Sequence, residues 1–204
     1  MIGHSLKDLV YPIELTFDVR KLIDSYFELC KKINFSKEDI KNELSYNKIT
    51  TINLTHLPNL VGEDRWKKHR GGHFDVLKAG VKEGNFVKML DELDGSYIKE
   101  CIDAVKKYHL EKFNSDFIGR IQLISSAPGH TYPFHRDMHT KHRYHIPIIT
   151  DENFLFFMKE KTELHVLHLP ADGRCWYLNP TDITHTVGHL GKTPRTHLLL
   201  TSEK

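Results

Sequence analysis

The sequence predicts an α+β protein that is mainly β, with helices packed on the outside of a C-terminal β-barrel or sandwich. In the first half, apolar residues recur at helical spacing behind residues that favour helix N-caps. From residue 117 onward, short β-rich runs alternate with turn residues, which is typical of a sandwich or barrel. The 204 residues suffice for one domain, in which residues 1–115 support a β-core at 116–204.

The elements of the first half follow from local patterns. Residues 2–17 predict an extended arm with a short strand at 13–16. An amphipathic helix is expected over 18–33, and a shorter one from residue 36 to about 44, each opening on a capping side chain. The alternating, β-branched run 49–57 predicts a strand.

Residues 58–84 break the periodicity and mix turn residues with charges of both signs. A long irregular segment is often a binding loop or lid, and the alternative is a solvated loop with Trp66 packed on the core. Two helices are then expected, over 86–93 and 96–113.

Seven runs rich in β-branched and aromatic residues predict the strands of the second half. They are 117–125, 144–150, 154–158, 164–168, 175–178, 184–187 and 196–201.

Composition excludes several classes of protein. A formal net charge of +2 gives no basic footprint for nucleic acid or an anionic membrane. No apolar run reaches the ~18 residues that a membrane span needs, and the N-terminus has no signal-peptide pattern. Three widely separated cysteines form neither a disulfide framework nor a metal motif, so a reducing, cytoplasmic location is the expectation.

Histidine is abundant, with fifteen in the chain, and it is the commonest transition-metal ligand. His135 and Asp137 alternate with Arg136, so on an extended segment both side chains would lie on one face. His185, on a later predicted strand, is the candidate third ligand. Two histidines and one carboxylate form the facial triad of non-haem Fe(II) oxygenases. Ten residues on, Arg195 begins a strand and could bind a carboxylate deep in a barrel.

Four segments, in order, carry a resemblance to a known family: PGHTYPFHRD, RYHIPI, WYLNPTDITHTV and RTHLLL. Residues 117–201 resemble the Fe(II)- and 2-oxoglutarate-dependent oxygenases, and within them the aspartyl/asparaginyl β-hydroxylase-like family. The resemblance implies a double-stranded β-helix (jelly-roll, cupin-like) core. Because Asp137 is a carboxylate that the name-giving peptidyl hydroxylases lack, the chain is more similar to members that hydroxylate free amino acids such as proline.

The resemblance also implies roles for individual residues. His135, Asp137 and His185 would bind Fe(II), while Arg195 and His145 would bind the cosubstrate 2-oxoglutarate. Arg143 would lie near a substrate or cosubstrate carboxylate, and which of the two stays open. Further pocket candidates are Ser125, Ser126, Arg136, Trp176 and Arg70.

Three histidines on predicted strands, His165, His168 and His197, need no functional role. His189 lies near the position at which family members often have an asparagine. The expected reaction is hydroxylation of a C–H of an amino acid, free or within a peptide or protein, using O2, with ascorbate as reductant in vitro. Two alternatives remain: a cupin-like metal-binding sensor or isomerase, which would not need Arg195, and an interaction module without a metal.

Overall fold

A computed structural model describes residues 6–69, 78–137, 140–160 and 162–203. Its main sheet has six strands in the order β1-β9-β6-β11-β5-β2, and every pairing is antiparallel. The strands of this sheet are β1 (Val10–Thr16), β2 (Ile49–Asn53), β5 (Gly119–Ser126), β6 (His142–Ile149), β9 (Arg174–Leu178) and β11 (Arg195–Ser202).

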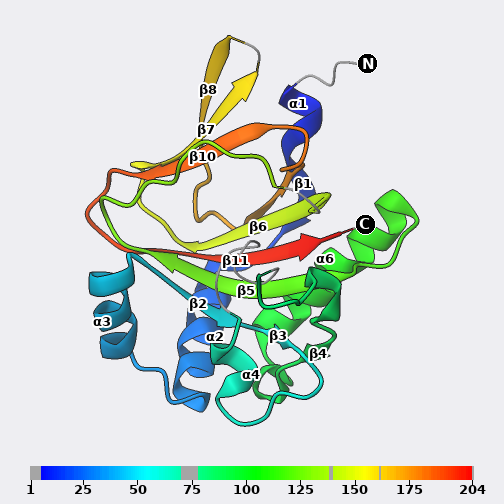
Figure 1. Ribbon diagram of the computed structural model, residues 1–204, viewed down its shortest axis with the longest axis vertical. Coiled ribbons are helices and arrows are strands. Elements are labelled where there is room, and N and C mark those ends of the chain that lie inside the picture. The colour runs from blue at the N-terminus through cyan, green and yellow to red at the C-terminus, as the bar shows by residue number, and fades with distance from the viewer. Residues whose placement is uncertain (1–5, 70–77, 138–139, 161, 204) are drawn as a thin grey trace.

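Two smaller sheets complete the β structure. The first is antiparallel in the order β10-β7-β8, and consists of β7 (Phe154–Glu160), β8 (Glu163–His168) and β10 (Thr184–His189). The second pairs β3 (Thr55–His56) with β4 (Lys88–Met89). Figure 1 shows the three-stranded sheet on one side of the six-stranded sheet and most of the helices on the other side.

The helices begin where the sequence places capping side chains. Asp18 Oδ1 accepts hydrogen bonds from the first backbone N–H groups of α2 (Val19–Lys32), and Ser36 forms a capping box at α3 (Lys37–Asn47). Ser96 caps α6 (Tyr97–Phe113) in the same way. The remaining helical turns are α1 (Leu6–Leu9), α4 (Asp64–Lys67) and the 3-10 turns η1 (Glu83–Asn85) and η2 (Asp91–Leu93).

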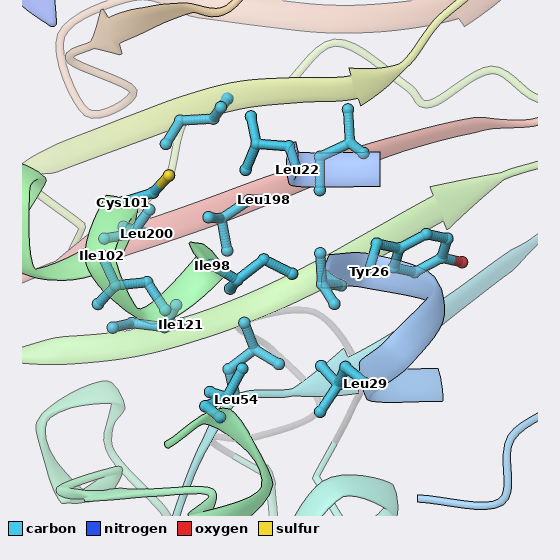
Figure 2. Packing of buried hydrophobic residues seen from close by; sticks show 14 of the residues in the cluster. Leu22, Tyr26, Leu29, Leu54, Ile98, Cys101, Ile102, Ile121, Leu198 and Leu200 are labelled. Atoms are coloured by element: carbon cyan, nitrogen blue, oxygen red, sulfur yellow. The ribbon is translucent and has the colours of Figure 1, made fainter. Parts of the chain in front are cut away.

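The main core lies between the helices and one face of the six-stranded sheet. Leu22 from α2 and Ile102 from α6 are fully buried against Leu198 and Leu200 of β11, as Figure 2 shows. Period-2 alternation then turns the other side chains of β11 to the opposite face. That face meets the three-stranded sheet, because Phe154 of β7 contacts Arg195 and His197.

The predicted helix at 86–93 is wrong. Phe86, Leu90 and Leu93 are all buried, and their i, i+4, i+7 spacing imitates one face of a helix. The backbone instead pairs with the β3 segment, where Leu90 N–H donates to the carbonyl of Leu54 at 2.9 Å. Tertiary pairing therefore overrides the local pattern.

The long irregular segment is partly packed on the core. Trp66 is buried against Phe35, with ring centroids 5.2 Å apart, which supports the alternative of a loop anchored by this indole. Arg65 forms ion pairs with Asp91 and Glu92, so it is engaged on the surface. Residues 70–77 lie outside the described residues, and the suggestion of a lid stays a prediction.

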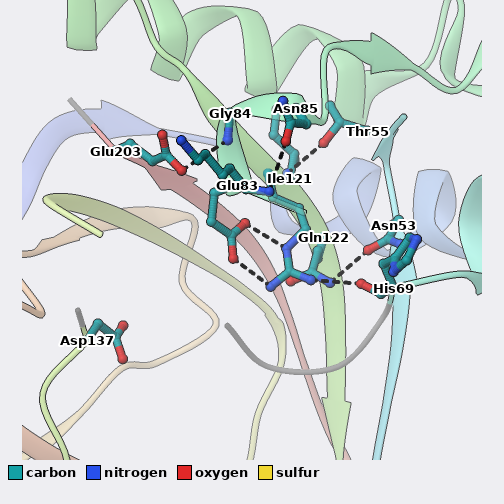
Figure 3. A network of polar contacts seen from close by, with 12 residues as sticks. Asn53, Thr55, His69, Glu83, Gly84, Asn85, Ile121, Gln122, Asp137 and Glu203 are labelled. Carbon is teal, nitrogen blue, oxygen red and sulfur yellow. Dashed lines mark hydrogen bonds and ion pairs between the residues drawn. The ribbon is translucent and has the colours of Figure 1, made fainter. Parts of the chain in front are cut away.

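A buried polar network attaches this segment to the sheet (Figure 3). Arg120 of β5 pairs with Glu83 at 2.9 Å, and their side chains are only 6% and 1% exposed. Arg120 also donates to the carbonyl of His69, so one guanidinium contacts both Glu83 and a residue fourteen positions earlier.

Replacing Glu83 by alanine is expected to destabilise the fold by about 3 kcal/mol, because it breaks a buried ion pair with Arg120. Urea unfolding measures this directly. The double variant Glu83→Leu/Arg120→Met removes both charges and is expected to be more stable than Glu83→Ala. A single variant within about 0.5 kcal/mol of wild type would contradict a structural role for the pair.

His142, the first residue of β6, is buried. Its Nδ1 lies 2.9 Å from the hydroxyl of Tyr177, and its ring packs on Phe113. Burial, followed by the nearby His109, lowers the pKa of His142 to about 4.

Stability is therefore expected to fall in acid through His142. The unfolded chain takes up this proton below about pH 6.5 and the folded chain only near pH 4, so the penalty grows between these values. At pH 5 it amounts to about 2 kcal/mol. Urea unfolding at pH 7.5 and 5.0 should show a smaller pH effect in His142→Phe than in wild type. Equal pH effects in His142→Phe and wild type would refute the assignment.

Candidate metal centre

His135, Asp137 and His185 lie together where the segment before β6 runs beside β10. Each offers one ligand atom, and the three atoms lie within 4.8 Å of one another. The backbone produces this arrangement. His135 and His185 exchange N–H···O=C hydrogen bonds of 3.0 and 2.8 Å, while Asp137 N–H donates to the carbonyl of Pro180. The segment before β6 thus runs beside β10, at the edge of the three-stranded sheet.

Both histidines have their ring orientation fixed. His135 Nδ1 donates to the carbonyl of Pro133 at 2.9 Å, and His185 Nδ1 donates to the carbonyl of Ile183 at 3.2 Å. Because a carbonyl can only accept, the neutral rings carry their protons on Nδ1, and Nε2 keeps its lone pair. Metal-binding histidines are held by such hydrogen bonds.

Charges and burial keep Asp137 and His185 in the forms that bind a cation, whereas the hydrogen bond with Asp137 raises the pKa of His135. Burial raises the pKa of Asp137, but Arg143 and then His135 outweigh this and hold it below its usual value. Burial, followed by Arg143, lowers the pKa of His185 to about 4. At neutral pH the site therefore has one carboxylate and a neutral His185, and the donor set fits a divalent transition metal.

Arg143 lies next to the triad. It reaches from β6 to form an ion pair with Asp137, and its side chain is 17% exposed. Its predicted contact with a substrate or cosubstrate carboxylate stays a prediction, since the carboxylate it contacts here is that of Asp137.

A second group of buried polar side chains lies on the six-stranded sheet. Arg195, at the start of β11, is buried and stacks on Phe154 with 4.0 Å between guanidinium and ring centroid. Its Nε has no hydrogen-bond partner in the described part of the chain. His145 on β6 is equally buried, and neither of its ring nitrogens is paired with a described residue. Unpartnered buried donors are costly, so this region is suited to a polar ligand.

The remaining pocket candidates are distributed differently. Ser126 pairs in register with Arg195, so it shares that face, and its hydroxyl is buried. Ser125 lies on the other face of β5, because its hydroxyl contacts that of Thr196 at 2.7 Å on the helix side of the sheet. Arg136 is exposed and donates to the hydroxyl of Thr184, which removes it from the pocket.

Trp176 of β9 pairs in register with His145 and is buried, and its predicted place in the pocket stays a prediction. Arg70 lies outside the described residues. His189 and His197, which have no predicted role, alternate with His185 on β10 and with Arg195 on β11.

Searches with family models and among curated proteins found no match. Among solved structures, a Pseudomonas putida prolyl-4-hydroxylase matches with a TM-score of 0.54 and 11% identity, covering 96% of this chain and 92% of that one. A 2OG-Fe(II) oxygenase-family oxidoreductase from Burkholderia pseudomallei matches at 0.44 and 14%, covering 83% and 91%. AviO1 from Streptomyces viridochromogenes Tue57 matches at 0.49 and 11%, covering 94% and 87%.

At these identities the likeness is one of fold alone, and only the first match exceeds a TM-score of 0.5. Among the described helices, none is long and apolar enough to cross a membrane. The chain therefore shares its fold with this prolyl-4-hydroxylase, and its described strands form antiparallel sheets.

Proposed function

We propose that this chain is an Fe(II)- and 2-oxoglutarate-dependent dioxygenase of the aspartyl/asparaginyl β-hydroxylase-like kind, with its two facing sheets forming a double-stranded β-helix. It would hydroxylate a C–H of an amino acid, free or within a peptide or protein, and release succinate and CO2. The observation that carries the proposal is the presence of a metal triad together with a buried arginine, Arg195, whose Nε has no hydrogen-bond partner among the described residues. A cupin-like sensor or isomerase would need the triad but not Arg195.

Different residues of the site would have different roles. His135, Asp137 and His185 would hold iron on one side and leave its other positions open. Arg195 would bind the distal carboxylate of 2-oxoglutarate, and His145 would line the pocket between the two ends. Arg143 keeps Asp137 ionised and oriented through their ion pair. When bound, the iron and 2-oxoglutarate supply the oxidising chemistry with O2, while the protein provides geometry and excludes water.

Succinate formation tests the proposal. The protein is supplied with Fe(II), ascorbate and 2-oxoglutarate, and each of the twenty free amino acids or a pool of short peptides is added. Strong stimulation by one free amino acid would identify both reaction and substrate, and stimulation only by peptides would make it a peptidyl hydroxylase. If nothing exceeds background, thermal melting with 2-oxoglutarate is decisive. Stabilisation by 2-oxoglutarate that requires Fe(II) or Mn(II) would support the oxygenase proposal. If 2-oxoglutarate gives no such stabilisation, the cupin-like alternative is favoured.

A further inference from the structure

A cavity of about 620 Å³ lies on the helix side of the six-stranded sheet. It lies between α1, the start of β1, the end of α6 and the residue that follows β11, segments that occupy the same side of the molecule in Figure 1. His142 of β6 lines it, whereas the next residue, Arg143, lies on the opposite face of the strand and pairs with Asp137. The cavity is therefore separate from the metal centre, and its volume is in the range of about 300–1,000 Å³ that small-molecule sites have.

Aromatic rings form one wall of this cavity. Tyr11 of β1 packs on Tyr177 of β9 with ring centroids 5.0 Å apart, and Phe113 of α6 lies 5.7 Å from the Tyr177 ring. The imidazole of His142 continues the wall, with its ring centroid 4.1 Å from that of Phe113. A wall of this kind provides apolar contact for methylene groups, and aromatic faces also attract cations.

The charged residues of the lining are mostly acidic. Asp8, Asp182 and Glu203 contribute carboxylates, and Lys141 contributes the one ammonium group among the described lining residues. Asp182 and Glu203 accept hydrogen bonds from neutral amide groups and form no ion pair with a described residue. The described lining thus has an excess of two negative charges. A cleft in which one sign of charge dominates concentrates ions of the opposite sign.

The buried imidazole of His142 is a second, independent sign of a ligand. Its side chain is only 4% exposed, and its Nδ1 is 2.9 Å from the hydroxyl of Tyr177. Its Nε2 has no hydrogen bond to any other residue that the structure describes. When Nδ1 donates to the Tyr177 oxygen, Nε2 has a lone pair that an ammonium N–H can use. A buried polar atom without a partner is costly, so the lining lacks one hydrogen-bonding group at this point.

The spacing of the carboxylates favours an organic cation over a metal ion. In the described part of the chain, only the triad brings three possible ligand atoms within 4.8 Å of one another, so Asp8, Asp182 and Glu203 do not converge on one point. Calcium and magnesium need several oxygen ligands close around a single ion. Separated carboxylates beside an aromatic wall instead suit ammonium groups that are joined by a methylene chain.

We propose that this cavity binds a linear aliphatic diamine. Its two ammonium groups would pair with the carboxylates of the lining, with His142 Nε2 as a further acceptor, and its methylene chain would lie on the rings of Tyr11 and Tyr177. The two positive charges balance the excess of two negative charges in the lining. The site uses neither iron nor 2-oxoglutarate, so the inference is independent of the proposed function.

Calorimetry on the full chain tests the proposal, with 1,5-diaminopentane as the probe and 1,5-pentanediol as its uncharged counterpart. No metal is added, so the amine cannot bind to an ion held by the triad. One equivalent of the diamine should bind, and the diol should bind at least about tenfold more weakly because it lacks both charges.

Variants of the charged lining residues should act in opposite directions. Asp8→Asn and Asp182→Asn should each weaken diamine binding by about threefold to tenfold. Lys141→Gln should strengthen it by about twofold to fivefold, because a competing cation is removed. Asp172→Asn is the matched control and should stay within about twofold of wild type, since Asp172 pairs with Arg174 on the surface, outside the cavity.

Absence of saturable diamine binding, equal affinity for the diol, or unchanged affinity in both aspartate variants would each overturn the proposal. Displacement of the diamine by an equal concentration of Mg(II) would overturn it too, because the lining would then attract any cation. If a variant does not fold, NMR of the wild-type protein replaces it. Ring resonances of Tyr11 and Tyr177 should shift with the diamine, and shifts confined to His135 and His185 would refute the assignment.

Discussion

Asp137→Ala is expected to lower divalent-metal affinity by more than about a hundredfold and to reduce coupled turnover to background. Asp137 is the only carboxylate of the triad, so its loss removes a ligand and the negative charge that offsets the cation. The change also leaves Arg143 pointing at the two imidazoles without its ion-pair partner. A positive charge would then stand where the metal has to bind.

Metal stoichiometry and affinity, measured by calorimetry with Mn(II) or Zn(II), check this prediction independently of any substrate. Asp172→Ala is the control, because Asp172 pairs with Arg174 on the surface. Asp137→Ala should also cost about 3 kcal/mol in urea unfolding without metal, since it breaks a pair whose side chains are only 9% and 17% exposed. A variant that still binds one equivalent of metal tightly, or retains substantial turnover, would remove Asp137 from the ligand set.

The sequence was most informative where one local signal determines one local structure. The caps at Asp18, Ser36 and Ser96 start three helices because a short side-chain acceptor satisfies N–H groups that the helix cannot. Alternation along β10 and β11 likewise predicted which side chains share a face. The triad was accessible for the same reason, since His135 and Asp137 are two apart on an extended segment.

What the sequence could not provide depends on contacts between distant segments. Nothing local shows that β1 and β2 join the main sheet, because strand pairing is a long-range choice. The same limit explains the wrong helix at 86–93 and the buried position of His142, whose partner Tyr177 lies 35 residues away. Arg143 could be placed near a carboxylate, but its pairing with Asp137 appears only in three dimensions.

His189 and His197 illustrate this point within the site. Their alternation with His185 and Arg195 is readable in the sequence, but histidines on strands are common and usually have partners. Only the packing of the two sheets shows that both rings are buried against Phe154. That contact depends on neighbours from distant strands and not on the residue itself.

Arg195→Leu is expected to weaken 2-oxoglutarate binding by about a hundredfold or more while leaving metal affinity unchanged. Arg195 is buried at the start of β11, on the far side of His145 from the triad. Calorimetry on the Zn(II)-loaded protein measures both affinities, and 2-oxopentanoate should bind the variant and the wild type equally. Arg174→Leu is a matched control, because Arg174 also stacks on an aromatic ring, that of Trp176, but is half-exposed. An unchanged KM for 2-oxoglutarate would count against the assignment.

The same substitution should have the opposite effect on the free protein. Burial lowers the pKa of Arg195 to about 9, which reflects the cost of holding a cation away from water without a carboxylate beside it. Leucine keeps the contact with Phe154 and removes that cost, so the metal-free variant is expected to be at least as stable as wild type in urea. An arginine that served only the fold would show the reverse, with loss of stability and no selective loss of 2-oxoglutarate. Lower stability together with unchanged 2-oxoglutarate affinity would therefore make Arg195 a structural residue, because only a ligand-binding cation is retained at a cost to the free protein.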